Sequence, residues 1–222
     1  MTPKQRAAEA VSILKTRYPD AVCALRYEGD PFRLLVMARL SAQCTDKRVN
    51  LVSEALFAAL PDPAAMAAAP VGEIEDLVRS CGLYHTKARD LKAMSEQLLA
   101  RFGGAVPEGM EDLLSLPGVG RKIANLIRGD LYGLPAVVTD THCIRIGGRL
   151  GLYPEDLKDP PKIEKILAAA IEPAEQSDFC HRIVLLGREI CTARAPACGA
   201  CPLRGICRHA AEPKGTSKKK RK

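Results

Sequence analysis

The sequence lacks any apolar run long enough to cross a membrane, because charged residues interrupt every such stretch. Residues 1–17 also lack the apolar core of a signal peptide and have instead the spacing of an amphipathic helix. These absences favour a cytoplasmic protein with no membrane contact. In a reducing compartment the nine cysteines are expected to be metal ligands or buried thiols, because disulfides do not persist there.

Strand patterns, internal repeats and low-complexity linkers are missing as well. Only residues 136–138 have a strand-like character, and this segment is too short to found a sheet. Helix signals are frequent instead, since a capping side chain precedes a proline in Thr2-Pro3, Asp30-Pro31, Asp62-Pro63 and Asp159-Pro160. Residues 32–40 predict a central buried helix, and the whole pattern predicts an all-α protein of about ten helices.

Only the C-terminal end of the chain has a strong excess of positive charge. Residues 212–222 carry six basic side chains and one acid, so this tail contributes +5 of the net charge of +7. We expect the tail to be disordered. The rest of the chain carries only about +2, so any nucleic-acid binding by it would depend on a local patch and on oriented backbone groups.

The string LPGVGRK, residues 116–122, interrupts the helical pattern. It predicts that one short helix ends before it and that another begins near Arg121. Gly118 and Gly120 permit positive φ values and leave amide groups exposed beside a helix N-terminus, which favours a bound phosphate. A tight turn that uses glycine only for steric reasons is the alternative.

Lys122 lies in the first turn of the second helix of this hairpin. A helical lysine is ordinarily a solvated surface group, but the positive end of the helix dipole disfavours an ammonium and so favours a nucleophilic amine. Asp140 follows in the string VTDTH. It could simply cap a helix that begins near Thr141, or it could accept a proton from Lys122 and stabilise positive charge on a sugar.

Four of the nine cysteines have the spacing C-x6-C-x2-C-x5-C, namely Cys191, Cys198, Cys201 and Cys207. Four thiols this close predict a metal site, whereas a disulfide pair would require an oxidising compartment. The spacing leaves zinc and an iron–sulfur cluster open. The loop after Cys191 carries Arg194 and no acid, so a metal-held loop could present this arginine to a phosphate.

Five segments together resemble the endonuclease III branch of the helix-hairpin-helix DNA glycosylases. In chain order they are LSAQCTDKRVN (40–50), GLYHTKA (82–88), LPGVGRKIAN (116–125), VTDTH (138–142) and the cysteine string. The resemblance implies two all-α lobes with a DNA-binding cleft between them. A six-helix lobe with the hairpin would span residues 22–134, and an iron–sulfur lobe would combine residues 1–21 with 135–211.

The resemblance also implies a function. It is that of a monomeric, nucleoid-associated DNA glycosylase and AP lyase, which excises oxidised pyrimidines from double-stranded DNA and cleaves 3′ of the abasic site by β-elimination. Lys122 would form the Schiff base and Asp140 would be its catalytic partner. The four cysteines would hold a 4Fe–4S cluster that positions DNA and does no redox chemistry, and a monovalent cation would bind at the hairpin.

DNA contacts are implied at further positions. Gln43 would fill the gap left by an extruded base, and Leu83 would enter the duplex as a wedge. The remaining expected DNA-binding residues are His85, Gly118, Gly120, Arg121, His142 and Arg194. Four positions depart from the usual pattern: His85 replaces asparagine, Cys44 alanine, Ile123 threonine, and Arg128 an apolar residue. His85 and Ile123 leave the lesion preference open.

Two rival functions remain. A monofunctional glycosylase of the adenine-mismatch branch would lack a lysine at position 122 and would carry an additional C-terminal domain. A non-catalytic, zinc-stabilised DNA-binding module would leave the combination of Lys122 and Asp140 unexplained, and it would be colourless, whereas an iron–sulfur protein is brown.

Overall fold

The computed structural model describes residues 1–211, and within them it contains helices and no strand, so the all-α prediction is confirmed. Residues 136–138, the one strand-like segment, are extended chain. The predicted disordered tail, residues 212–222, lies outside the described residues. The α-helices are α1 Pro3–Arg17, α2 Pro31–Leu40, α3 Asp46–Ala59, α4 Pro63–Ala68, α5 Val71–Val78, α6 Tyr84–Phe102, α7 Met110–Ser115, α8 Arg121–Tyr132, α9 Thr141–Leu150, α10 Pro160–Ala170, α11 Gln176–Glu189 and α12 Arg208–Ala211.

The four predicted helix starts are confirmed. In each, the capping side chain accepts a hydrogen bond from the amide three residues later, and the proline occupies the first helical turn; the caps are Thr2, Asp30, Asp62 and Asp159. None of the described helices is both long and apolar enough to cross a membrane.

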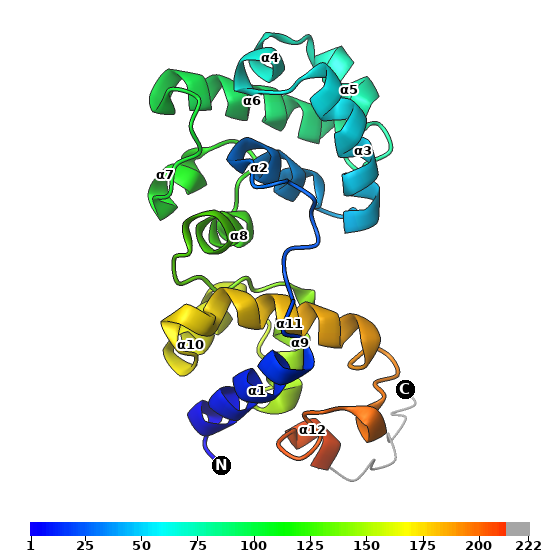
Figure 1. Ribbon diagram of the computed structural model, residues 1–222, viewed down its shortest axis with the longest axis vertical. Coiled ribbons are helices and arrows are strands. Elements are labelled where there is room, and N and C mark those ends of the chain that lie inside the picture. Colours follow the sequence, from blue (N-terminus) through cyan, green and yellow to red (C-terminus); the bar gives the residue numbers. More distant parts are fainter. Residues whose placement is uncertain (212–222) are drawn as a thin grey trace, which may run out of the picture. The chain divides into compact units, whose positions relative to one another are not determined.

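The chain divides into two compact units. The unit Cys23–Ala136 contains α2 to α8 and is built around α2, which contacts α3, α6 and α8 (Figure 1). Eight of the ten residues of α2 are buried, as expected for a central helix. Helix α8, which carries Lys122, therefore packs against a helix that is itself buried.

The other unit combines residues 1–22 with the chain from residue 137 onward. In it α11 contacts both α1 and α9, and α12 contacts α9. Buried Arg6 of α1 donates hydrogen bonds to the carbonyl oxygens of Gly151 and Ile206, at 3.2 and 2.7 Å. This arginine therefore connects the N-terminal helix to the segment that contains the four-cysteine string.

Candidate functional site

The hairpin joins α7 to α8, as the sequence predicted, but only one of its two glycines needs a positive φ. Gly118 has φ +75°, whereas Gly120 has φ −101° and is the N-cap of α8. Both glycines are exposed, and within residues 1–211 neither amide N–H has an acceptor. The turn therefore presents two free backbone donors beside a helix N-terminus, an arrangement suited to an anion.

A partly buried ion pair supports this turn. Arg39 of α2 donates from Nε and Nη2 to Asp90 Oδ2 of α6, at 2.8 and 2.5 Å. A Cβ at Gly118 would lie 2.7 Å from Arg39 Cδ and 2.8 Å from Asp90 Oδ2, which no real side chain tolerates. Glycine is thus required at position 118 both by the backbone conformation and by the close approach of this pair.

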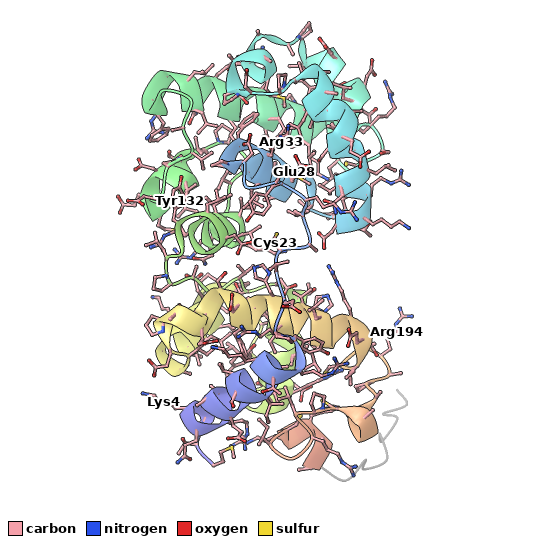
Figure 2. All side chains as sticks on the ribbon, viewed as in Figure 1. Lys4, Cys23, Glu28, Arg33, Tyr132 and Arg194 are labelled. Atoms are coloured by element: carbon pink, nitrogen blue, oxygen red, sulfur yellow. The ribbon has the colours of Figure 1, made fainter. Side chains whose placement is uncertain are left out.

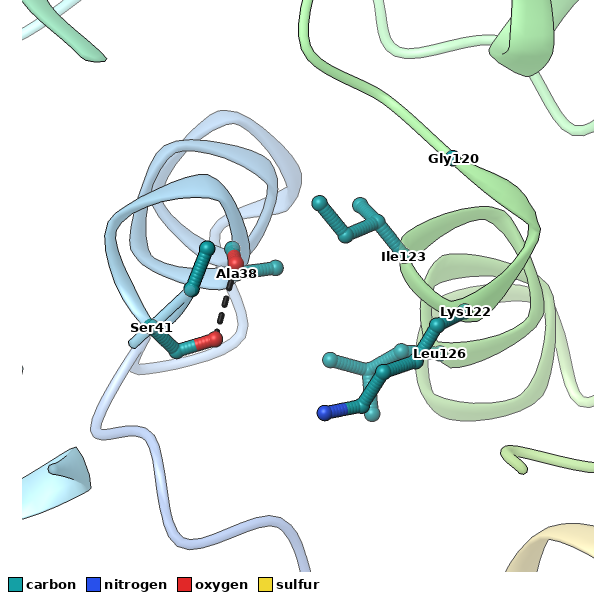
Figure 3. A pocket seen from close by; sticks show the side chains of 7 residues that line it. Ala38, Ser41, Gly120, Lys122, Ile123 and Leu126 are labelled. Carbon is teal, nitrogen blue, oxygen red and sulfur yellow. Dashed lines mark hydrogen bonds between the residues drawn. The ribbon is translucent and has the colours of Figure 1, made fainter. Parts of the chain in front are cut away.

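Lys122 is exposed and lines a pocket of about 200 Å³ between α8 and the C-terminal end of α2. Figure 3 shows its amine directed from α8 toward the side of the pocket on which Ser41 lies. The lining residues are Ala38, Ser41, Ala42, Gly120, Lys122, Ile123 and Leu126. The Ser41 hydroxyl donates to the Ala38 carbonyl at 2.8 Å, so its oxygen remains able to accept a hydrogen bond. A single amine therefore projects into a small, mostly apolar pocket.

Asp140 is half-buried and is the N-cap of α9. Its Oδ1 accepts a hydrogen bond from the Cys143 amide at 2.7 Å. The structure thus shows the simpler of the two roles that the sequence allowed, a helix cap. The cap also fixes the orientation of the carboxylate.

His142 follows in the first turn of α9, and its position depends on Arg145. The Arg145 guanidinium lies 3.1 Å from His142 Nδ1, and because arginine can only donate, that nitrogen accepts and Nε2 carries the proton. Arg145 also donates to the carbonyl oxygen of Cys191 at 2.9 Å. Gly187 of α11 makes room for both side chains, because a Cβ there would lie 3.0 Å from Arg145 Nη2 and would clash with His142 Nδ1.

The four cysteines of the string line one pocket, together with Arg149, Ile190 and His209. Burial raises the pKa of the Cys201 and Cys207 thiols, and the neighbouring thiols raise it further because thiolates repel one another. A cationic metal centre would remove this repulsion. The sequence prediction that these four residues come together is consistent with this geometry.

Arg149 holds the loop that follows Cys191. It is 8% exposed, and it donates to the carbonyl oxygens of Thr192 and Ala193, both at 2.8 Å, and to Cys191 Sγ at 3.4 Å. Arg194, on the same loop, is exposed, and Figure 2 shows it at the surface. The loop therefore has a rigid base and a free guanidinium at its tip.

Two non-glycine residues with positive φ lie next to one another in space. Gln43 has φ +52° and Leu83 has φ +61°, and both side chains are exposed. Their loops touch, because a Cβ at Gly82 would lie 3.4 Å from the Gln43 carbonyl oxygen. Such backbone strain is typical of functional sites. His85 is also exposed, but its Nδ1 lies 2.9 Å from Glu75 Oε1 and its ring packs on Tyr84.

Comparisons with known proteins decide the family. Residues 36–173 match the HhH-GPD superfamily of base excision DNA repair proteins, and residues 191–207 match the iron-sulfur binding domain of endonuclease III. Endonuclease III of Synechocystis sp. is 44% identical, with 92% of each chain covered. Endonuclease III of Escherichia coli K12 is 34% identical, with 93% of this chain and 96% of the relative covered. The chain belongs to the endonuclease III family.

Solved structures agree with this assignment. A trapped covalent intermediate of an endonuclease III with DNA matches with a TM-score of 0.89 at 38% identity, covering 95% of this chain and 98% of the other. A thermostable thymine-DNA glycosylase, 20% identical, has the same fold with a TM-score of 0.85. As a member of the endonuclease III family, the chain is a DNA glycosylase of base excision repair with an iron–sulfur site.

The residues present fit an iron–sulfur cluster. Four cysteine thiols, without a carboxylate among them, share one pocket, and four thiolates are the usual ligand set of such clusters. Cys191, Cys198, Cys201 and Cys207 would hold the group. Arg149 and Arg145, which bind the sulfur and the carbonyl oxygen of Cys191, would fix the first of these ligands.

Sequence reasoning missed the residues that support the site. Ser41 lies within the same segment as Gln43, and Leu126 is one helical turn after Lys122, so local spacing could have found both. Arg145 and Arg149 follow Asp140 in one helix, but nothing in the sequence links them to Cys191. The pair of Arg39 with Asp90 joins two distant helices and left no local signal.

Proposed function

We propose that this endonuclease III is a bifunctional DNA glycosylase and AP lyase that acts through a Schiff base on Lys122. The observation that carries the proposal is the Lys122 amine, which projects into the pocket between α8 and α2, directly after the glycine hairpin. The trapped covalent DNA intermediate of a 38% identical relative supports a nucleophile of this kind. The rival monofunctional glycosylase has no role for a lysine here.

In the proposed mechanism, Lys122 is the nucleophile and Asp140 assists it. Neutral Nζ of Lys122 attacks C1′ of the extruded nucleotide, and the bond to the damaged base breaks with its electron pair leaving on the base. The C1′–O4′ bond then breaks, O4′ takes up a proton and the amine nitrogen forms the imine. The imine acidifies the C2′ proton, and loss of this proton expels the 3′ phosphate by β-elimination. Asp140 stabilises the positive charge that develops on the sugar and accepts the amine proton.

The DNA contacts that we propose do not read sequence. The amides of Gly118 and Gly120, followed by Arg121, bind a phosphate, and Arg194 and His142 contact the backbone elsewhere. Gln43 and Leu83, held by strained backbone, occupy the space from which a base is extruded. His85 binds DNA only after leaving Glu75. A monovalent cation at the hairpin stays a prediction.

Substrate size follows from the pocket beside Lys122. Its volume of about 200 Å³ is below the roughly 300–1,000 Å³ typical of sites for drug-sized ligands, which suits a single base or sugar. We propose oxidised pyrimidines as substrates, with Ile123 providing an apolar wall. The cluster, which we propose to be of the 4Fe–4S type, supplies a rigid support for the loop of Arg194.

Single-turnover assays on oxidised-pyrimidine and abasic duplexes test this function. We expect Lys122→Gln to bind lesion DNA while losing strand cleavage by about 10³-fold or more, because the nucleophile is removed. Lys4→Gln is the matched control, since Lys4 is likewise exposed and is the second residue of its helix. Cleavage by the Lys122 variant at the rate of the control would refute the assignment.

A further inference from the structure

A pair of thiols lies beneath the two strained loops and has no part in the proposed chemistry. Cys44 directly follows Gln43, and Cys81 precedes Leu83 by two residues. Their immediate chain neighbours, Gln43 and Gly82, are in contact, and the Cys44 thiol is near enough to raise the pKa of Cys81. Cys81 is fully buried, whereas Cys44 is partly exposed. Cys44 is thus the member of the pair that solvent can reach.

The same two loops are tied together at two further points. The Gln43 carbonyl oxygen lies against Gly82, as described above. Lys87, fully buried in the first turn of α6, donates from Nζ to the Leu40 carbonyl oxygen at 2.8 Å. The thiols therefore sit at a fixed junction between the end of α2 and the start of α6, and any change in their separation must move Gln43 and Leu83.

The Lys87 ammonium partly offsets the effect of burial on these thiols. Burial lowers the pKa of the Lys87 ammonium, and the two thiols oppose this shift by interacting favourably with its charge. Burial and Cys44 raise the pKa of Cys81 to about 11, while Lys87 acts in the opposite direction. Cys81 thus stays a thiol until a reactive partner forms beside it, and the nearby ammonium then supports its thiolate.

We propose that Cys44 and Cys81 form a reversible disulfide when hydrogen peroxide reaches Cys44, and that this bond displaces the loops of Gln43 and Leu83. The Cys44 thiolate attacks peroxide, forming an S–O bond as the O–O bond breaks and hydroxide leaves. The Cys81 thiolate then attacks this sulfur, forming the S–S bond and releasing the second oxygen as water. Together, two thiols lose two electrons and two protons, and peroxide becomes two waters.

The consequence for DNA follows from geometry and rests on the proposed roles of Gln43 and Leu83. An S–S bond of about 2.05 Å is much shorter than any non-bonded contact between two sulfur atoms. The two loops must therefore shift toward one another, and a misplacement of ~1 Å in a site can reduce the rate by about 10²-fold. The oxidised enzyme is expected to excise lesions more slowly until a reductant opens the bond.

A second pair of neighbouring cysteines provides an internal control. Cys143 and Cys180 are also close enough for Cys180 to raise the pKa of Cys143, but their exposed fractions are only 1% and 3%. Peroxide has no access to either sulfur in the folded chain. Oxidation through an accessible thiol therefore predicts a bond at Cys44 and Cys81 and none at Cys143 and Cys180.

Peptide mapping of the full-length holoenzyme tests the bond itself. Purified protein is treated with hydrogen peroxide, its free thiols are alkylated, and it is digested with trypsin without reduction. We expect peptides 40–47 and 80–87, each with a single cysteine, to be linked in the wild type and separate in Cys44→Ala. Both peptides recovered fully alkylated would overturn the proposal. So would a bond between Cys143 and Cys180, because it would mean that oxidation follows unfolding.

Excision assays test the consequence. The rate of oxidised wild type should fall about 10- to 100-fold and recover with dithiothreitol, while Cys44→Ala stays within about twofold under the same treatment. Unchanged visible absorbance would show that the cluster survives. A linked pair with an unchanged rate would refute the coupling to the loops. A chain that is linked but inactive even when reduced would refute the proposed function and leave the disulfide standing.

Discussion

Gly118 shows how much one residue without a side chain contributes to the site. Its φ of +75° and its contact with the pair of Arg39 and Asp90 both exclude a Cβ. Gly120, two residues later, has ordinary φ and open space around it. The two glycines of the hairpin are alike in sequence and different in structure, so mutation separates them.

We predict that Gly118→Ala destabilises the protein by about 1–3 kcal/mol, because the backbone strain and the contact act together. Gly120→Ala, where only an N-cap preference changes, should cost about 1 kcal/mol or less. Urea denaturation of the two variants measures the difference. Equal losses would mean that the contact beneath Gly118 contributes nothing to stability.

Cys23 provides a prediction for the dependence of stability on pH. Burial, and to a lesser degree Asp130, raise the pKa of this thiol from 9.0 to about 12. Between these values the folded chain binds the proton and the unfolded chain releases it, so this contribution to stability is complete below pH 9 and is lost as the pH rises toward 12. Cys23→Ser should therefore lose less stability than wild type between pH 8 and pH 11 in denaturant titrations. A parallel loss in both proteins would contradict the assignment.

At the scale of elements, the starts of helices were the most predictable feature. An Asp or Thr before a proline caps a helix through contacts within four residues, so the local sequence is sufficient. The hairpin was predictable for the same reason. The backbone conformations of Gln43 and Leu83 were not, because their positive φ values depend on the contact between two loops that are forty residues apart.

The residues that hold the site in place could not be predicted from the sequence either. Arg39 and Asp90 are 51 residues apart in the chain, and Arg145 contacts Cys191 across 46 residues. No periodicity links partners at such distances. The sequence therefore predicts which residues would carry the chemistry, and the structure was required to find those that hold them.

The N-terminus of α9 allows capping and catalysis by Asp140 to be separated. Asparagine caps a helix about as well as aspartate but carries no charge. We predict that Asp140→Asn keeps the stability of wild type and loses lesion excision, whereas Asp140→Ala loses excision and also about 0.5–2 kcal/mol of stability. Thermal denaturation and single-turnover kinetics on the two variants check this. Full activity of the Asn variant would reduce Asp140 to a cap.

For the whole molecule, the charge is concentrated at one end, since residues 212–222 contribute +5 of the net +7. Removal of residues 213–222 should flatten the salt dependence of nonspecific DNA binding, because fewer counterions are released. Lesion chemistry should stay intact, since every proposed contact with the nucleotide lies within the folded units. Titrations at several salt concentrations, with single-turnover rates alongside, test both statements. Loss of chemistry on truncation would contradict them.

The central claim is that the amine at position 122 bonds to the sugar of the damaged nucleotide. Borohydride added during reaction with an oxidised-pyrimidine duplex reduces an imine to a stable amine, so the enzyme should be captured on DNA. Peptide mapping of the captured complex should then locate the DNA on Lys122. Strand cleavage that continues with no captured complex, or capture on a different residue, would contradict the account.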